Sequence, residues 1–392
     1  MIKNDVVITG ANRTAVGSLG KSLKNISGEE LGAAVISEAI MRSKIKPSDV
    51  DEVIMGQVLT GGSGQNPARQ AAIKSGIPKE KPAYIVNQVC GSGIRSIASG
   101  FQSIKAGDSK IVIAGGQESM SLAPHAIHLR DGKKLGDAQI TDTMIKDGLW
   151  DAFNGYHMGV TAENVATKFQ VTRDDQDKFA LESQKKAFQA QKDNKFKEEI
   201  INFKIKSKKT ETVFNKDEHP REGINLEALR RLKPVFKKDG TVTAGNSSGI
   251  NDGAAALTLM SSEEAEKREM QKLVSIKSWT SCGVDPALMG TGPIPSSKRA
   301  LDLAGWSIND VDLFEINEAF AAQSIAVIRT LSIPEEKVNV NGGAIALGHP
   351  IGASGTRILV TLIHEMIKRD VKKGLATLCI GGGMGIAMCI ER

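Results

Sequence analysis

The strongest constraint on the fold is a set of short matches between the two ends of this 392-residue chain. Three segments near the N-terminus recur near the C-terminus, in the same order and at offsets of 261, 262 and 266 residues. They are Asp49-Val50-Asp51 with Asp310-Val311-Asp312, Ser92-Gly93-Ile94-Arg95 with Ser354-Gly355-Thr356-Arg357, and Ala114-Gly115-Gly116 with Ile380-Gly381-Gly382. Matches in one order at nearly constant spacing indicate two copies of one fold.

Each copy alternates short apolar runs with amphipathic stretches. In the first copy this pattern predicts strands at 6–9, 53–57, 83–87 and 110–116, and helices at 29–42, 67–75 and 90–106. Alternating strands and helices are typical of an α/β domain with a largely parallel sheet. The chain is also too long for one ordinary core, so we expect two or three domains.

The middle of the chain has a different character from both copies. Residues 121–248 are polar, rich in lysine and partly helical, with a helix predicted over 172–191. The apolar run at 252–260 then indicates a return to the first core. We therefore predict an N-terminal domain made of 1–120 plus 249–270, an inserted loop domain at 121–248 and a C-terminal domain at 271–392.

The net charge of +6 is concentrated in the inserted segment. Residues 201–248 carry six acidic residues against eleven basic ones, which are Lys204, Lys206, Lys208, Lys209, Lys216, Arg221, Arg230, Arg231, Lys233, Lys237 and Lys238. Aromatic residues make up only 4% of the chain, and no RNA-binding signature or helix-turn-helix pattern accompanies the basic residues. A polyphosphorylated small molecule is therefore a better partner than nucleic acid, and a solvated charged face is the alternative.

Several classes of protein are excluded by what the chain lacks. No stretch approaches the roughly eighteen apolar residues of a membrane span, so we expect no membrane association. The N-terminus has neither a signal peptide nor a transit peptide pattern, which predicts a cytoplasmic protein. The four cysteines form no C-x-x-C and are expected to be free, and the six histidines form no metal-binding pattern.

Two cysteines lie in settings that favour acyl chemistry on sulfur. Cys90 ends a strand and precedes Gly91-Ser92-Gly93 and a helix, whose N-terminus would stabilise a thiolate. Cys379 precedes Gly381-Gly382-Gly383, whose N–H groups could form an oxyanion pocket. A buried cysteine without chemistry is the alternative for both, and the glycines could instead serve close packing.

Two further polar residues are candidates for the same site. His349 lies in a glycine-rich loop and is a candidate base for a thiol, although single histidines are often structural. Asn317 follows an apolar strand at 311–316 and could hold a water or a carbonyl group, or could cap a helix.

Taken together, the chain resembles the thiolase family essentially from end to end. Six motifs occur in the family's order, namely Asn87-Gln88-Val89-Cys90-Gly91-Ser92-Gly93, Gly115-Gly116-Gln117-Glu118-Ser119-Met120-Ser121, Asn246-Ser247-Ser248-Gly249-Ile250-Asn251-Asp252-Gly253-Ala254, Asn317-Glu318-Ala319-Phe320, Gly348-His349-Pro350 and Cys379-Ile380-Gly381-Gly382-Gly383. The resemblance implies a duplicated α/β domain that forms a five-layered αβαβα core, with a loop domain inserted in the first half.

The resemblance also implies a role for each candidate residue. Cys90 would take the acyl group from an acyl-CoA, and His349 would activate Cys90 and help to bind the thioester oxygen. Cys379 would move the α-proton of acetyl-CoA, and Asn317 would hold a water in the first oxyanion hole. The N–H groups of Cys90 and Gly381 would form the second oxyanion hole.

The same resemblance implies which residues bind the substrate. Arg221, Ala244 and Ser248 match positions that contact CoA, and the residues of the acyl and CoA site also include His157, Met158, Phe236, Met289, Ala319 and Phe320. This set is typical of acetyl-CoA C-acetyltransferases, with acetyl-CoA, acetoacetyl-CoA and CoA as substrates and products. It implies no metal, no other cofactor and a homotetramer. The alternative is a broad-range degradative 3-ketoacyl-CoA thiolase of β-oxidation.

Overall fold

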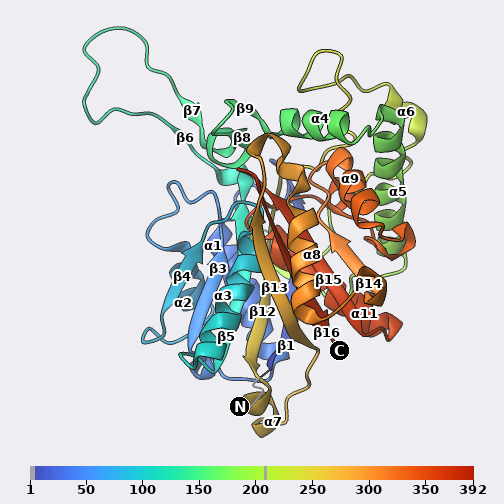
Figure 1. Ribbon diagram of the computed structural model, residues 1–392. Helices are drawn as coiled ribbons and strands as arrows, with labels where there is room; N and C mark the ends of the chain where they lie inside the picture. Colours follow the sequence, from blue (N-terminus) through green and yellow to red (C-terminus); the bar gives the residue numbers. More distant parts are fainter. Residues whose placement is uncertain (1–4, 207–209) are drawn as a thin grey trace.

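The computed structural model describes residues 5–206 and 210–392 (Figure 1). Its main sheet contains β1 (Val6–Arg13), β2 (Gly17–Ser18), β3 (Glu52–Gly56), β4 (Ala83–Val86), β5 (Ile111–Ser119), β12 (Asn251–Ser261), β13 (Val274–Gly283), β14 (Leu313–Ile316), β15 (Lys373–Ile380) and β16 (Met384–Glu391). Three small pairs are β6 (His125–Ala126) with β7 (Thr141–Asp142), β8 (Trp150–Asp151) with β9 (Tyr156–His157), and β10 (Phe203–Lys206) with β11 (Glu211–Phe214).

Helices precede or follow most strands of the sheet. They are α1 (Gly28–Arg42), α2 (Pro67–Lys74), α3 (Ser92–Ala106), α4 (Met158–Lys168), α5 (Arg173–Lys192), α6 (Leu226–Arg230), α7 (Ser262–Lys267), α8 (Pro293–Ala304), α9 (Ala321–Leu331), α10 (Ala344–Leu347) and α11 (Ser354–Arg369). Short helical turns are η1 (Pro47–Asp49), η2 (Met120–Leu122), η3 (Met144–Leu149), η4 (Pro286–Thr291), η5 (Ile308–Asp310) and η6 (Glu335–Lys337).

The strands follow the same order in both halves of the sheet. The first half runs β1-β12-β5-β3-β4 and the second runs β13-β16-β15-β14, and the halves meet where β1 pairs with β13. Only the pairs β3–β4, β3–β5 and β14–β15 are parallel among the described strands. The prediction of a largely parallel sheet is therefore wrong, because β12 and β16 return antiparallel beside the strands that precede them.

Three apolar clusters divide the core into five layers. One cluster packs α1 and α2 against the first half of the sheet, and another packs α8 and α9 against the second half. Between them, α3 and α11 share a cluster with strands of both halves. Burial of the apolar faces of these helices is the main contribution to the stability of the fold, at about 25 cal/mol for each Å² of apolar surface removed from water. The predicted αβαβα arrangement is confirmed.

Equivalent hydrogen bonds show that the two halves are copies. The carboxylate of Asp51 accepts the N–H groups of residues 110 and 111 at the start of β5, and Asp312 accepts those of residues 372 and 373 at the start of β15. The two aspartates are about 262 residues apart, and so are the N–H groups that they bind. The first residues of α3 and α11 have the same separation. The third sequence match is not structurally equivalent, because Gly115 and Gly116 lie within β5 whereas Gly381 and Gly382 follow β15.

The first turns of α3 and α11 touch at two glycines. A Cβ on Gly93 would lie 2.5 Å from the backbone nitrogen of Thr356, and one on Gly355 would lie 2.5 Å from that of Ile94. No larger residue fits at such a close approach of two backbones. This contact brings the loops that precede the two helices together, although 262 residues separate the helix starts.

The middle of the chain forms the upper part of the molecule in Figure 1, drawn in green to yellow. A buried guanidinium ties it to the first half: Arg13 of β1 bonds Glu199 at 2.7 Å and Asp217 at 2.7 Å. Three of the basic residues predicted there, Lys204, Arg230 and Arg231, form exposed ion pairs, so part of the positive field is neutralised locally. Lys208 and Lys209 lie outside the described residues.

Within residues 5–206 and 210–392, none of the helices combines the length and the apolar character that crossing a membrane requires.

Candidate active site

Cys90 lies on a tight turn between β4 and α3. The preceding Val89 has a φ of +45°, which is an outlier for a β-branched residue. The turn is held by Ser92, whose hydroxyl donates to the Val89 carbonyl at 2.6 Å and accepts the Gln88 N–H at 2.9 Å. Backbone strain of this kind is found where a functional side chain must be held in one place. The helix begins at Ser92, two residues later than predicted.

Cys379 comes to the same place from the second half of the sheet. It is fully buried near the end of β15, two residues before the turn Gly381-Gly382-Gly383 that leads into β16. Gly382 and Gly383 have φ values of +86° and +83°, which other residues rarely adopt. The backbone N–H groups of Gly381 and Cys90 both reach the Cys90 sulfur, and Cys90 is close enough to Cys379 for their charges to interact.

Burial sets the charge state of both thiols. Loss of water raises the pKa of Cys90 to about 11, although hydrogen bonds from the Gly381 and Cys90 backbones lower it. Burial also raises the pKa of Cys379, and the neighbouring Cys90 raises it further. The prediction that the α3 N-terminus makes Cys90 a thiolate is therefore wrong for the resting site, because desolvation outweighs the helix end. Cys90 is a neutral thiol that needs a base.

His349 lies in a loop of the second half whose Ile351 belongs to the apolar cluster that Cys90 packs against. Its backbone N–H donates to Asn251 at 2.9 Å, its Nδ1 lies 2.6 Å from the Ser354 hydroxyl, and its Nε2 lies 3.4 Å from Asn317 Nδ2. Burial lowers the pKa of His349 to about 3, and the positive charge of Arg357 adds to this effect. The imidazole is therefore neutral and able to accept a proton.

Asn317 follows β14 and faces the same ring. Its side chain is buried, and among the described residues no donor reaches its Oδ1. A buried carbonyl oxygen without a partner costs roughly 1–3 kcal/mol, so this atom offers an acceptor for a water or a ligand. Asn317 does not cap α9, which begins after Phe320.

An apolar cluster surrounds Cys379 and contains most of the predicted acyl-site residues. Met158, Met289, Ala319 and Phe320 are buried in it, and Phe236 packs against it. His157 stacks on Phe236 with ring centroids 4.6 Å apart, and its Nδ1 accepts the N–H of Gly159 at the start of α4. Burial lowers the pKa of His157, which favours its neutral form.

The three residues predicted to contact CoA lie outside this cluster. Arg221 and Ala244 are exposed, and Ser248 is half-buried. Ser248 is connected to the cluster through its N–H, which donates to the Ala319 carbonyl at 3.0 Å. The structure thus joins Ser248 to the site and leaves Arg221 and Ala244 at the surface of the inserted segment.

Comparisons with known proteins agree on one family. Residues 6–263 match the model "Thiolase, N-terminal domain", and residues 270–392 match "Thiolase, C-terminal domain". The chain belongs to the thiolase family. It is 59% identical to an acetyl-CoA acetyltransferase of Paracoccus denitrificans over 98% of this chain and 99% of that protein.

Two solved structures share the fold of this thiolase over nearly its whole length. A Bacillus anthracis acetyl-CoA acetyltransferase is 45% identical, with a TM-score of 0.97 over 99% of this chain and 98% of the other. Human mitochondrial 3-ketoacyl-CoA thiolase is 42% identical, with a TM-score of 0.96 over 99% of both chains. The fold alone therefore does not separate the two activities predicted from the sequence.

Sequence reasoning missed three residues that hold the site of this thiolase together. Asn251 binds the His349 N–H, and a Cβ on Gly348 would collide with it. Glu118 accepts N–H groups from Val58 and Leu59 and, at 2.8 Å, from residue 352 in the His349 loop. Ser354 contacts the imidazole itself. Asn251 and Glu118 lie in motifs that were recognised, but the partners of their side chains come from distant segments.

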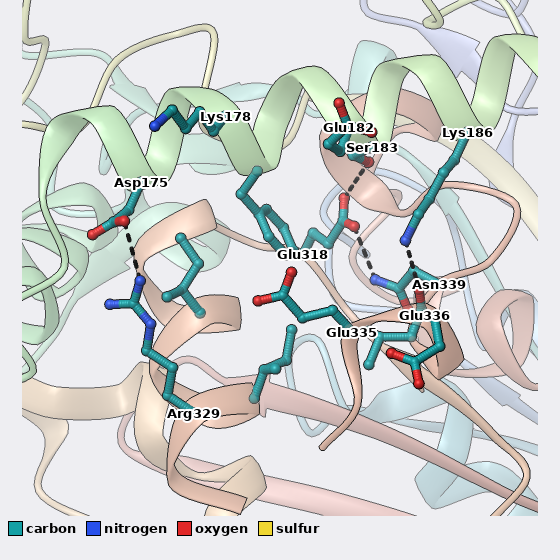
Figure 2. A pocket seen from close by; sticks show the side chains of 14 residues that line it. Asp175, Lys178, Glu182, Ser183, Lys186, Glu318, Arg329, Glu335, Glu336 and Asn339 are labelled. Atoms are coloured by element: carbon teal, nitrogen blue, oxygen red, sulfur yellow. Dashed lines mark hydrogen bonds and ion pairs between the residues drawn. The ribbon is translucent and has the colours of Figure 1, made fainter. Parts of the chain in front are cut away.

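Buried polar contacts also hold the segment that follows Asn317. Figure 2 shows a pocket between α5, α9 and the segment around η6, with the Glu318 carboxylate bonded to Ser183 and Asn339. Glu318 also accepts the Ile345 N–H at 3.1 Å, so it connects β14, α5 and α10 directly beside Asn317. None of the predicted site residues lines this pocket.

Proposed function

We propose that this thiolase is an acetyl-CoA C-acetyltransferase that interconverts two acetyl-CoA with acetoacetyl-CoA and CoA. The observation that carries the proposal is the proximity of two thiols, Cys90 and Cys379, with Cys90 packed against the apolar cluster of Ile351, in the loop that carries the neutral imidazole of His349. One sulfur can carry the acetyl group while the other moves a proton at carbon. The reaction uses CoA thioesters as substrates and needs no metal or redox group.

Thiolysis begins with attack of Cys90 on the ketone carbon of acetoacetyl-CoA. The thiol proton passes to Nε2 of His349, and the negative charge that forms on the ketone oxygen faces the N–H groups of Cys90 and Gly381. Both donors already reach the Cys90 sulfur in this structure. Losing one such donor typically costs about 3 kcal/mol of transition-state stabilisation.

Cleavage of the carbon–carbon bond then leaves the electron pair on acetyl-CoA as an enolate. The thioester oxygen accepts hydrogen bonds from the newly protonated His349 and from a water on Asn317. Cys379 gives its proton to the α-carbon and becomes a thiolate. The raised pKa of Cys379 supports this step, because a resting neutral thiol is the form that can act as an acid.

CoA completes the cycle by attacking acetyl-Cys90. Its thiol proton restores Cys379, the acetyl group moves to CoA, and the Cys90 sulfur recovers its proton from His349. Every proton that leaves a side chain is thus returned, and condensation is the same sequence in reverse.

The apolar cluster around Cys379 supports a short acyl group. Phe236 and Phe320 lie edge to face with centroids 6.2 Å apart, and Met158 and Met289 are buried beside them. Thiolysis of acetoacetyl-CoA and of 3-ketodecanoyl-CoA should be compared under identical conditions. We expect acetoacetyl-CoA to have the higher kcat/KM, and faster turnover of the longer substrate would favour the degradative alternative.

We further propose that the inserted domain, residues 121–248, binds CoA beside the domains formed by 1–120 plus 249–270 and by 271–392. Arg221 would contact a phosphate group, and Ala244 and Ser248 would follow the pantetheine arm. Arg221 is exposed, and the Ser248 N–H donates to Ala319 in the apolar cluster around Cys379. These two observations support a binding path for CoA that runs from the surface to the thiols. We expect Arg221→Ala to raise KM for CoA with little change in kcat, and exposed Arg231→Ala to change neither.

We also propose a homotetramer in the cytoplasm, acting on CoA thioesters and not on nucleic acid. The long loop between β6 and β7 extends away from the body in Figure 1 and exposes apolar side chains, with Leu135 92% accessible. Such exposed apolar groups often mark an interface. Light scattering of Leu135→Asp should show a smaller assembly, whereas Leu303→Asp on α8, also exposed, should not.

A further inference from the structure

His349 has a hydrogen-bond partner on each ring nitrogen. Nδ1 lies 2.6 Å from the hydroxyl oxygen of Ser354, which is the first residue of α11 and is fully buried. That hydroxyl in turn donates to the carbonyl oxygen of Pro350 at 2.9 Å. On the other side of the ring, the amide Nδ2 of Asn317 lies 3.4 Å from Nε2.

These contacts agree on a single tautomer. The Pro350 carbonyl can only accept a hydrogen bond, so the Ser354 hydroxyl that donates to it turns its lone pairs toward Nδ1, and the short contact is then made by a hydrogen on Nδ1. The Asn317 amide is a donor, so Nε2 must be the acceptor. Both ends of the ring therefore place the imidazole hydrogen on Nδ1 and leave Nε2 unprotonated, with its lone pair facing Asn317.

We propose that Ser354 is a positioning residue that sets the tautomer of His349, so that Nε2 carries no hydrogen and can exchange its contact with Asn317 for the proton of Cys90. The proposal rests on the proposed function, in which His349 is the base for that thiol. During attack the S–H bond of Cys90 breaks and an N–H bond forms at Nε2, while Nδ1–H stays bonded to Ser354. The charge that forms on the ring is thus shared with the serine oxygen.

Other charged and titratable groups around the site do not provide this function. Arg357 lies one turn further along α11 and disfavours a second positive charge on His349. Glu118 acts on Cys90 through its charge and binds backbone N–H groups, and Cys379 is a neighbour of Cys90. Among the described residues, only Ser354 makes a hydrogen bond with Nδ1 of His349.

The test is the pH dependence of Cys90 alkylation by iodoacetamide, followed by mass spectrometry of the Cys90 peptide. Around pH 7 alkylation depends on proton removal by His349, whereas near the Cys90 pKa of about 11 the thiolate forms by itself. For Ser354→Ala we expect the rate near pH 7 to fall by at least about tenfold, since general bases contribute about 10²–10⁴-fold. The alkaline rate should stay unchanged. The kcat for thiolysis should fall by the same factor, with KM for acetoacetyl-CoA unchanged.

Ser297→Ala is the matched control, because Ser297 is a buried serine on α8 whose hydroxyl has no partner among the described residues. A Ser354→Ala profile like that of Ser297→Ala overturns the proposal, and so does an equal loss at neutral and alkaline pH, which indicates a merely disturbed pocket. If Ser354→Ala does not fold, Ser354→Cys replaces it, since a thiol of similar shape is a weak acceptor. If full alkylation of Cys90 leaves wild-type thiolysis intact, the proposed nucleophile fails instead.

Discussion

The two halves of this thiolase share one architecture but differ in their side chains where the copies meet. At the spacing of about 262 residues set by Asp51 and Asp312, Asn87 corresponds to His349, and Cys90 corresponds to Gly352. In the proposed mechanism the first copy therefore supplies the nucleophile and the second supplies the base, from positions three residues apart in the shared fold. Gly352 has no room for a side chain, because a Cβ there would lie 2.6 Å from Glu118.

The same contrast holds for the two thiols. Cys90 lies on a strained turn in front of a helix and is half-buried, whereas Cys379 lies at the end of a central strand and is fully buried. A site that must both bond to carbon and move a proton needs two groups with different access to the substrate. Duplication brought the two loops together, and divergence gave each copy its own part of the chemistry.

Removal of the nucleophile should have the largest effect on activity. Cys90→Ala leaves no sulfur to carry the acetyl group, so we expect kcat for acetoacetyl-CoA thiolysis to fall by about 10⁴-fold or more. Cys282→Ala provides the control, because Cys282 is a free, half-buried cysteine on β13. Cys90 cannot be the nucleophile if its variant retains wild-type activity.

Removal of the second thiol should separate the two half-reactions. In Cys379→Ala no acid remains to protonate the enolate, so we expect thiolysis to fall by about 10³-fold. Transfer of acetyl from radiolabelled acetyl-CoA to Cys90 should persist, because the proton that His349 takes from Cys90 can pass to the leaving CoA thiolate without Cys379. Cys389→Ala controls for loss of a buried thiol on the neighbouring strand β16. An equal loss in both assays would reject the division of roles between the two cysteines.

Replacing His349 by the residue type found at the equivalent position of the first copy should have a smaller effect on kcat. His349→Asn places in the second half the residue type that the first half has at position 87. We expect kcat to fall by about 10²-fold, because the base is lost while an amide can still donate to the thioester oxygen. His364→Asn is the control, since His364 is a half-buried histidine on the helix that follows the His349 loop, α11, and bonds to the Ala11 carbonyl. Matching activities of the two variants would contradict the role of His349.

The sequence predicted well those features that depend on local pattern. The strand and helix alternation, the duplication and the motif residues Cys90, His349, Cys379 and Asn317 could all be found from residue types and spacing. Contact between the first turns of α3 and α11 at Gly93 and Gly355 brings together the loops that carry Cys90 and His349.

Features that depend on the whole fold could not be predicted. The charge state of Cys90 was missed because the helix end is visible in the sequence, whereas the desolvation that outweighs it is not. The antiparallel strands were missed because β12 follows an insertion of more than a hundred residues. Ser354 was noted only as part of a repeat, since its contact with His349 depends on how the loop between them bends.

The inserted segment, which only the first copy has, gives the last and smallest expected effect on catalysis. Arg13 is fully buried and binds Glu199 and Asp217, and Asp217 also accepts the Val16 N–H at 2.7 Å. Arg13→Met leaves two carboxylates buried without their partner, which should destabilise the fold by about 3–5 kcal/mol. The exposed pair of Arg231 with Glu227 is the comparison, and Arg231→Met should cost about 0–1 kcal/mol.

Urea unfolding followed by circular dichroism measures the stability difference, and thiolysis at low temperature measures activity. We expect Arg13→Met to lower the unfolding midpoint strongly while kcat of the folded enzyme stays near that of the wild type, because no catalytic side chain contacts Arg13. A reduced kcat without a shift in the midpoint would mean that the ion pair tunes the site and does not simply anchor the insertion. The inserted segment of the first copy would then influence catalysis by residues of both copies. The assignment of separate catalytic roles to the two copies would be wrong in that case.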